Sequence, residues 1–181
     1  MPFNILKAKK NLSAVILCGG EGQRLRPLTT IIPKPLIKIK NKTIIEYIIN
    51  HFLKYKINNI IIVTGYKHRL LNNFISKKYK KKIIVINTGL KTEIAKRVKK
   101  ISKYLKRNVI LCYGDTLVDI NLNNLIKFYL KDHNKFIISS YRFKSSFGIL
   151  EMDKKDNVYT STKLGPEGWT ETLTQLLSLK D

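Results

Sequence analysis

The chain has few acidic residues, only two cysteines and no long apolar run among its 181 residues. Each cysteine, Cys18 or Cys112, ends a short apolar run, which is typical of small buried residues and argues against a disulfide framework or a metal-binding cysteine pair. Residues 1–13 lack the apolar region of a signal peptide, and no apolar run approaches the length that spans a bilayer. We therefore expect a soluble, cytoplasmic protein with no membrane partner.

The scarcity of acidic residues leaves a large positive charge. Only 12 aspartates and glutamates face 35 lysines and arginines, which gives a formal net charge of +23. Such a charge is typical of nucleic-acid binding, but the lysines are spread along the chain beside abundant isoleucine and asparagine, as a codon bias toward A and T produces. Because the sequence has no RNP, zinc-finger or homeodomain pattern, we expect no specific nucleic-acid partner, although a basic nucleic-acid-binding module stays open as an alternative.

Runs of strand type alternate with segments of helical spacing along most of the chain. We expect strands at 13–18, 60–64, 82–87, 108–113 and 135–142, with a further strand beginning at 147–151. We expect helices at 42–56, 70–78, 92–105 and 122–130. In the helix at 92–105 the inward side chains are expected to be those of Ile94, Val98, Ile101 and Leu105. The alternation predicts an α/β fold, a Rossmann-like and mostly parallel sheet covered by helices on both faces.

The strongest functional pattern begins where the strand at 13–18 ends in a glycine-rich, basic turn. Glycine lets the backbone approach a ligand closely, so that successive N–H groups can point at phosphate oxygens, and arginine or lysine adds charge-assisted hydrogen bonds. The pattern therefore predicts a phosphate-binding loop, with an ordinary strand-to-helix turn as the alternative. Its glycines are Gly19, Gly20 and Gly22, and its basic residues are Arg24, Arg26 and Lys34.

Two familiar nucleotide-binding patterns do not match this turn. No Lys-Ser/Thr pair follows the glycines, as a Walker loop requires, and the third glycine of the dinucleotide fingerprint is missing. Pro33 and Pro35 bracket Lys34 and fix the backbone on both sides, so Lys34 is expected on a stiff segment.

Asp115 follows the strand expected at 108–113. Ligands of parallel sheets bind at the carboxyl ends of the strands, where Gly114 and Asp115 would meet the glycine turn. A carboxylate there can hold a hard cation such as Mg²⁺ together with phosphate oxygens and waters. Asp115 is therefore a candidate metal ligand, and a turn-capping aspartate is the structural alternative.

A longer string of residues resembles the signature of the sugar-phosphate nucleotidyltransferases, also called NDP-sugar pyrophosphorylases. The string is Leu17-Cys18-Gly19-Gly20-x-Gly22-x-Arg24-Leu25-Arg26-Pro27-Leu28-Thr29, followed by Pro33-Lys34-Pro35. Within this family, the glucose-1-phosphate cytidylyltransferase branch is the most similar. The motifs that carry this likeness are Gly65-Tyr66-Lys67, Thr88-Gly89-Leu90-x-Thr92, Lys96-Arg97-Val98 and Tyr113-Gly114-Asp115-x-x-x-Asp119. The resemblance covers roughly residues 13–151.

The resemblance implies a nucleotidyltransferase-type fold and the transfer of CMP from CTP to a small phosphorylated acceptor, with release of pyrophosphate. It implies that Arg24 and Lys34 are catalytic, the first toward the leaving pyrophosphate and the second toward the acceptor phosphate. It also implies that Asp115 binds Mg²⁺, for which Mn²⁺ can substitute. The implied nucleotide-binding residues are Leu17, Cys18, Gly19, Gly20, Glu21, Gly22, Gln23 and Gly114.

Three departures from the family pattern affect these expectations. Gln23 stands where the family usually has threonine, and residues 93–95 differ from the family's Met-Thr/Gly-Gly. The family's second magnesium-binding aspartate has no convincing counterpart. Asp119 is expected to cap a helix, and Asp153 and Asp156 are expected in turns.

The acceptor and the catalytic status stay open at this point. A sugar 1-phosphate is the family's usual acceptor, and a phosphorylated amino acid such as phosphoglutamine, activated by CTP for capsule phosphoramidate synthesis, is a known variation on this fold. A non-catalytic nucleotide-binding protein is the second alternative. The sequence does not define the oligomeric state, so a homo-oligomer also stays open.

The composition changes near residue 160. Isoleucine and asparagine disappear, and threonine, leucine and glycine take over. We therefore expect a nucleotidyltransferase core at 1–159, shortened at its carboxyl end, and a tail of different origin at 160–181, introduced by a frameshift or an artificial junction. The alternative is an ordinary final helix at 170–179.

Overall fold

The structure is a computed structural model that describes residues 5–131, 136–143, 149–152, 158–162 and 168–178. The chain divides into two compact units, one formed by Met1–Ile137 with Thr174–Asp181 and the other by Ile138–Leu173. The expected turn residues Asp153 and Asp156 lie outside the described residues.

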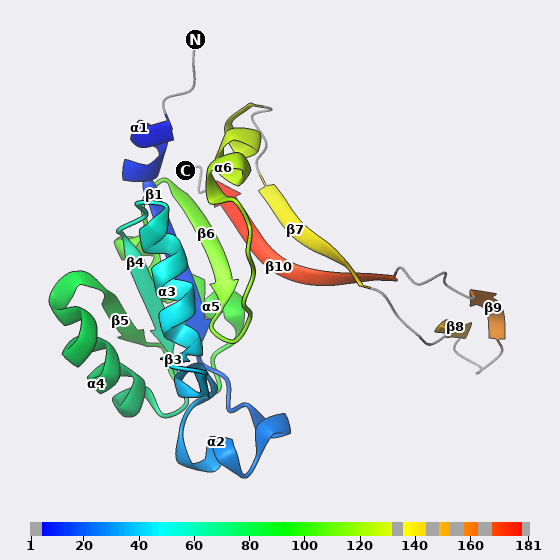
Figure 1. The fold of residues 1–181 in the computed structure, drawn as a ribbon, viewed down its shortest axis with the longest axis horizontal. Helices are drawn as coiled ribbons and strands as arrows, with labels where there is room; N and C mark the ends of the chain where they lie inside the picture. The colour runs from blue at the N-terminus through cyan, green and yellow to red at the C-terminus, as the bar shows by residue number, and fades with distance from the viewer. Residues whose placement is uncertain (1–4, 132–135, 144–148, 153–157, 163–167, 179–181) are drawn as a thin grey trace. The chain divides into compact units, whose positions relative to one another are not determined.

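Four parallel strands form the centre of the first unit (Figure 1). They are β1 (Leu12–Cys18), β4 (Ile60–Thr64), β5 (Ile84–Asn87) and β6 (Asn108–Tyr113). Every residue of β1 and β4 is buried, which explains why these strands are continuous apolar runs without alternation. Strand β10 (Gly168–Ser178) pairs antiparallel with β6, and the full strand order is β5-β4-β1-β6-β10-β7, where β7 is Phe136–Phe143.

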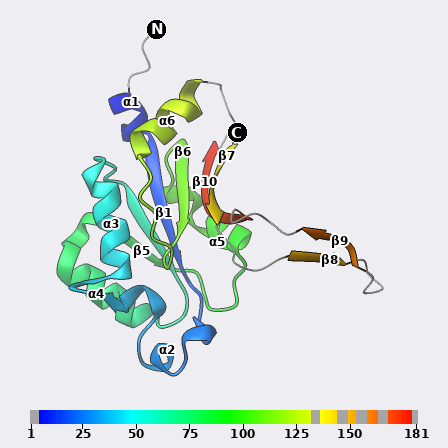
Figure 2. The same ribbon diagram turned by 45° about the vertical axis from the view of Figure 1, so that its right-hand side comes forward.

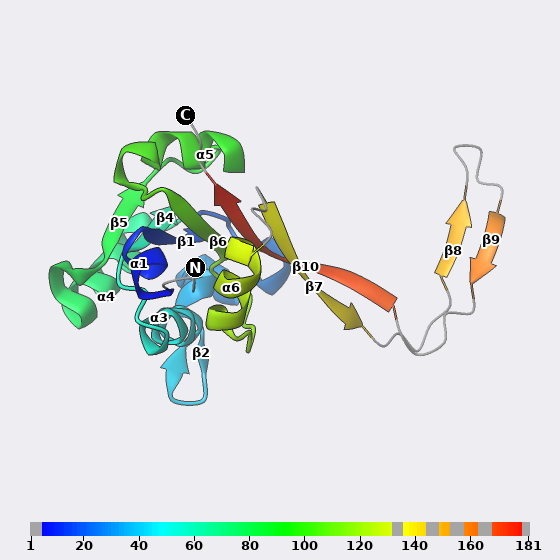
Figure 3. The ribbon, with the colours of Figure 1, turned by 90° about the horizontal axis from the view of Figure 1, so that it is seen from above.

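Helices cover both faces of the parallel strands. Residues from three helices, α3 (Ile44–Lys54), α4 (His68–Tyr79) and α6 (Leu122–Lys131), pack with Ala14, Ile16 and the other side chains of one face. On the other face, Ile101 of α5 (Ile94–Ile101) packs with Val15, Leu17 and Val63. Figure 3 shows α5 and α3 on opposite sides of the sheet. The α/β fold expected from the sequence is therefore confirmed.

Shorter elements connect these layers. In the first unit they are α1 (Ile5–Lys10), η1 (Gln23–Leu25), α2 (Leu28–Ile31), η2 (Lys34–Leu36), β2 (Lys38–Ile39), β3 (Lys42–Thr43), η3 (Lys80–Lys82) and η4 (Ser102–Tyr104). In the second unit β8 (Ile149–Met152) and β9 (Val158–Thr162) form an antiparallel pair.

Three local expectations were wrong. The segment at 170–179 was expected to be a helix in one alternative, but it lies mostly in strand β10. Asp119 does not cap α6, because that helix begins at Leu122 and the side chain of Asn121 accepts the N–H of Asn124 instead. Ile94 was expected to point inward, but it is 46% exposed.

No helix in the described ranges is long and apolar enough to cross a membrane.

Candidate active site

The glycine turn lies at the carboxyl edge of the parallel strands, followed by the segment that carries α2 (Figure 2). Gly22 has φ of 65°, a left-handed conformation that favours glycine. Its carbonyl accepts a hydrogen bond from Thr29 Oγ1 at 3.0 Å, and the carbonyl of Thr29 accepts one from the Tyr66 hydroxyl at 2.9 Å. Two hydrogen bonds in series thus connect the turn to the loop that follows β4.

Arg97 lies under the first glycine of this turn. Its guanidinium donates to the carbonyls of Thr64 at 3.0 Å and Leu90 at 2.9 Å, and to Thr88 Oγ1 at 2.6 Å. Arg97 is only 6% exposed, and burial lowers the pKa of its guanidinium. These hydrogen-bond acceptors are neutral, so the turn lies against a buried positive charge without a carboxylate partner among the ion pairs of the described residues.

Lys34 and Asp115 meet beside the same turn, although they are 81 residues apart in the sequence. Lys34 Nζ donates to Asp115 Oδ2 at 2.7 Å, and the two side chains are 31% and 37% exposed. Asp115 has one local partner, Thr116 Oγ1, at 3.5 Å. The carboxylate is therefore directed toward the lysine from the proline-bracketed segment.

A cavity of about 320 Å³ connects these groups. It is lined by Leu17, Cys18, Gly19, Gly20, Gly22, Lys34, Pro35, Thr92, Glu93, Ile94, Arg97, Tyr113, Gly114 and Asp115. Burial raises the pKa of the Cys18 thiol well above its usual range, with smaller contributions from Cys112 and Asp115, so the thiol is neutral. The structure thus brings together the glycines, the lysine and the aspartate that the sequence indicated.

Three expected site residues do not line this cavity: Glu21, Gln23 and Arg24. Glu21 Oε2 accepts hydrogen bonds from Gln23 Nε2 at 3.0 Å and Arg26 Nη2 at 3.1 Å, so this carboxylate is engaged within the turn. Arg24 lies in η1 and is exposed. Their roles at the site stay predictions.

The buried position of Arg97 was not predicted from the sequence. The apolar spacing placed Ile94, Val98 and Ile101 on the inward face of α5, and Arg97 lies on that same helical face. A basic residue inside an apolar stripe was the available signal. Ile94 was given the inward position, but the structure buries Arg97 and leaves Ile94 at the wall of the cavity.

The donor groups at Asp115 fit a hard cation in part. The described residues contain no group of three or more histidines, cysteines, aspartates and glutamates that could hold a metal ion by themselves. Mg²⁺ is commonly held by one or two carboxylates together with substrate phosphates and waters. A half-exposed carboxylate at the wall of a cavity that also contains a glycine turn suits that mode.

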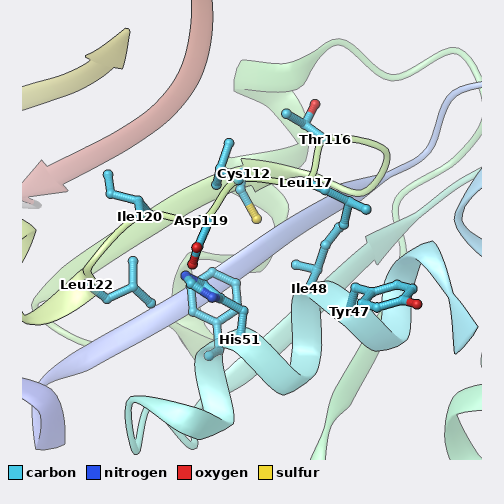
Figure 4. Close-up of a pocket in the computed structure, with 11 residues that line it drawn as sticks. Tyr47, Ile48, His51, Cys112, Thr116, Leu117, Asp119, Ile120 and Leu122 are labelled. Carbon is cyan, nitrogen blue, oxygen red and sulfur yellow. The ribbon is translucent and has the colours of Figure 1, made fainter. Parts of the chain in front are cut away.

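A second cavity of about 360 Å³ lies between α3 and the loop that follows Asp115. Its walls are mostly apolar, and the side chains of His51 and Asp119 point toward one another across it (Figure 4). His51 Nε2 is buried without a hydrogen-bond partner in the described structure. Asp119 therefore lies away from the cavity that holds Asp115 and cannot be counted as a second ligand there.

Comparison with known proteins identifies the family. The sequence profile of the family described as Nucleotidyl transferase matches residues 13–161. The chain belongs to the nucleotidyl transferase family. The resemblance to sugar-phosphate nucleotidyltransferases noted from the sequence motifs is thereby confirmed.

Two curated nucleotidyl transferases illustrate the range of relatives. One is named "Probable glucose-1-phosphate cytidylyltransferase", from Bacillus subtilis, and is 30% identical over 165 residues, covering 78% of this chain and 65% of that protein. The other is the D-glycero-alpha-D-manno-heptose 1-phosphate guanylyltransferase of Aneurinibacillus thermoaerophilus, which is 33% identical over 120 residues, covering 64% of this chain and 51% of that protein. The chain thus spans between half and two thirds of the length of these relatives.

The fold of the chain is also similar to that of a solved structure. HddC from Yersinia pseudotuberculosis, crystallised in complex with GMP-PN, superimposes with a TM-score of 0.69 at 23% sequence identity. The match covers 92% of this chain and 76% of that protein. At this identity the likeness supports the nucleotidyl transferase fold and says nothing about the substrate.

Proposed function

We propose that this chain carries the catalytic centre of an enzyme that transfers a nucleoside monophosphate from a nucleoside triphosphate to a small phosphorylated acceptor. One observation carries the proposal: the glycine turn, Lys34 and Asp115 line a single cavity at the carboxyl edge of the sheet. Backbone N–H groups, a cation and a carboxylate are what triphosphate binding with a hard cation requires. Membership of the nucleotidyl transferase family supports the same reaction.

In this proposal an acceptor phosphate oxygen attacks the α-phosphorus in line and pyrophosphate leaves. The acceptor is already an anion, so the residues act mainly by positioning and charge neutralisation rather than as a strong general base. The backbone amides of Gly19 to Gly22 hold the triphosphate over the buried charge of Arg97. Lys34 draws the acceptor phosphate toward the α-phosphate, and Arg24 neutralises charge on the departing pyrophosphate.

Asp115 is the residue that would hold a divalent cation. When bound, Mg²⁺ or Mn²⁺ would supply charge neutralisation for the phosphate oxygens. The carboxylate of Asp115 accepts a hydrogen bond from the Lys34 ammonium. A divalent cation and this ammonium are therefore alternative contacts for the same carboxylate.

We propose CTP as the donor nucleotide and a sugar 1-phosphate as the acceptor. The motifs of the cytidylyltransferase branch and the name of the Bacillus subtilis relative favour CTP. The name of the Aneurinibacillus thermoaerophilus relative favours GTP with a heptose 1-phosphate, which is the second candidate. A phosphorylated amino acid remains a third candidate for the acceptor.

A single panel tests the proposal. Pyrophosphate release is measured from each of the four nucleoside triphosphates with Mg²⁺ or Mn²⁺, against sugar 1-phosphates, heptose 1-phosphates and phosphorylated amino acids. Release with CTP and one acceptor would establish the donor and the acceptor together. Release only with GTP would replace the cytidylyl assignment, and silence across the panel with CTP still bound would identify a non-catalytic nucleotide-binding protein.

A further inference from the structure

The side chains of Lys34 and Asp115 are paired with one another in the candidate active site. Their hydrogen bond of 2.7 Å is also an ion pair, and it joins the residue proposed to attract phosphate to the residue proposed to hold the cation. Glu93, the other acidic residue that lines the cavity, is ion-paired with Lys96 at 2.9 Å. Asp115 is thus the carboxylate in this cavity that Lys34 neutralises.

Prolines restrict the backbone on both sides of Lys34, whereas its side chain lines the cavity and is partly exposed. Lys34 lies between Pro33 and Pro35, both buried, and begins the short helix η2. Its Cβ lies close to the glycine turn, because a Cβ built on Gly22 would be 3.4 Å from it. The side chain therefore starts beside the expected phosphate site and extends to Asp115, so rotation about its own bonds can move the ammonium between the two.

We infer that Lys34 holds the place of the divalent cation on Asp115 and is displaced to the phosphates when that cation binds. The inference rests on the proposed function, because it assumes that Asp115 is the cation ligand. A carboxylate that is 37% exposed and a lysine that is 31% exposed form a pair weak enough to exchange. One exchange then supplies both the cation and the free ammonium that the triphosphate and the acceptor need.

The arrangement couples cation binding to phosphate binding. Before the cation enters, the ammonium of Lys34 and the carboxylate of Asp115 cancel one another. After it enters, the cation satisfies Asp115 and Lys34 becomes available to an anion, so the cavity gains positive charge. Lys34 is in this sense a competitor of the cation as well as a phosphate-binding residue.

The test measures Mn²⁺ binding to the full chain without nucleotide. Binding is monitored by the decrease in the electron paramagnetic resonance signal of free Mn²⁺. Lys34→Met removes the competing ammonium and keeps the length of the side chain, so it should tighten Mn²⁺ binding about fivefold, the size expected for a partly exposed ion pair. Lys34→Arg keeps the positive charge and should bind no more tightly than wild type. Lys38→Met removes the same charge from the exposed strand β2 and should change affinity less than twofold.

The outcomes separate the inference from the proposed function. If Lys34→Met binds Mn²⁺ no more tightly than Lys38→Met while Asp115→Asn weakens binding, the exchange is wrong and the metal assignment stands. If Asp115→Asn binds Mn²⁺ like wild type, both the exchange and the metal assignment fail. Failure of the enzymatic proposal itself would appear separately, as absence of pyrophosphate release from every nucleotide.

A second measurement needs no variant and so does not depend on the variants folding. Limited acetylation of the wild-type chain, read by peptide mass spectrometry, compares Lys34 with Lys38 in the same sample. Addition of Mn²⁺ should increase acetylation of Lys34 relative to Lys38 at least twofold, because the ammonium leaves its carboxylate partner. An unchanged ratio at saturating Mn²⁺ would overturn the exchange.

Discussion

Gly19 lies directly against the buried guanidinium of Arg97. A Cβ built on Gly19 would lie 2.7 Å from Arg97 Nη2 and closer still to Nη1 and Cζ. Arg97 cannot easily move away, because the carbonyls of Thr64 and Leu90 and the hydroxyl of Thr88 hold its two terminal nitrogens. The first glycine of the turn is therefore required by a close approach, whereas Gly22 is required by its backbone angle of 65°.

This contact predicts unequal effects of alanine at adjacent glycines. Gly19→Ala should lower the free energy of unfolding by about 1 to 3 kcal/mol, because the added methyl group forces Arg97 or the turn to shift. Gly20→Ala is the matched control, because a Cβ at Gly20 meets no atom within 4 Å. It should change stability by less than about 0.5 kcal/mol. Urea denaturation measures both, and equal losses would show that Arg97 adjusts freely.

The elements of the parallel sheet could be predicted from sequence because their signals are local. Fully buried β-branched runs such as Ile60–Thr64 leave few alternatives, and they alternate with amphipathic helices. The position of Arg97 could not be predicted in the same way. Its acceptors are the carbonyls that end β4 and follow β5, so its burial depends on where those strands lie relative to α5. Strand β10 likewise depends on pairing with β6, whose paired residues lie 64 or more positions earlier, and a local helical pattern at 170–179 does not reveal this pairing.

Lys56 occupies a backbone position whose left-handed conformation favours glycine over lysine. Helix α3 ends with the N–H of Lys56 bonded to the carbonyl of Leu53 at 2.9 Å and the N–H of Ile57 bonded to that of Phe52 at 3.1 Å. This arrangement, a Schellman motif, places Lys56 at φ of 61°, where glycine is preferred.

Lys56→Gly should therefore raise the free energy of unfolding by about 0.5 to 1 kcal/mol, because glycine adopts the left-handed conformation without strain. Lys54→Gly provides the control: Lys54 is equally basic and exposed but lies within the last turn of α3. There glycine should lower stability by about 0.5 to 1 kcal/mol. Chemical denaturation of both variants checks the sign, and a loss of stability in Lys56→Gly would contradict the prediction.

Glu46 makes stability depend on pH at the acid end. It is 5% exposed, its carboxylate accepts hydrogen bonds from the N–H and hydroxyl of Thr43, and it is ion-paired with Lys78. Burial alone would raise its pKa, but the interaction with Lys78 and the hydrogen bonds from Thr43 outweigh burial and lower the pKa to about 2.

A carboxylate with a depressed pKa stabilises the fold above its unfolded pKa and loses that contribution as the pH falls through its folded pKa. The contribution of Glu46 should thus be complete above about pH 5 and disappear between about pH 4.5 and pH 2, with a total of about 3 kcal/mol. Glu46→Gln removes the charge and should be less stable at pH 7, with a flatter dependence in that window. Unfolding measured from pH 7 to pH 2 tests this, and parallel curves for wild type and variant would exclude Glu46 as the source.

Arg24 is the other residue expected to be catalytic. We predict that removing its side chain lowers activity more than removing the side chain of Arg26 does. Its side chain is exposed in η1 and takes part in none of the ion pairs found among the described residues, so it is available to the charge that builds on departing pyrophosphate. Arg24→Ala should lower kcat for pyrophosphate release about 100-fold to 1,000-fold, the size of losing one electrostatic donor. Arg26→Ala is the control, because Glu21 already occupies the Arg26 guanidinium at 3.1 Å. It should lower kcat less than about tenfold. If both variants lose activity equally, the total positive charge of the turn, and not Arg24 in particular, determines kcat. If Arg24→Ala keeps the wild-type kcat, Arg24 has no part in the chemical step.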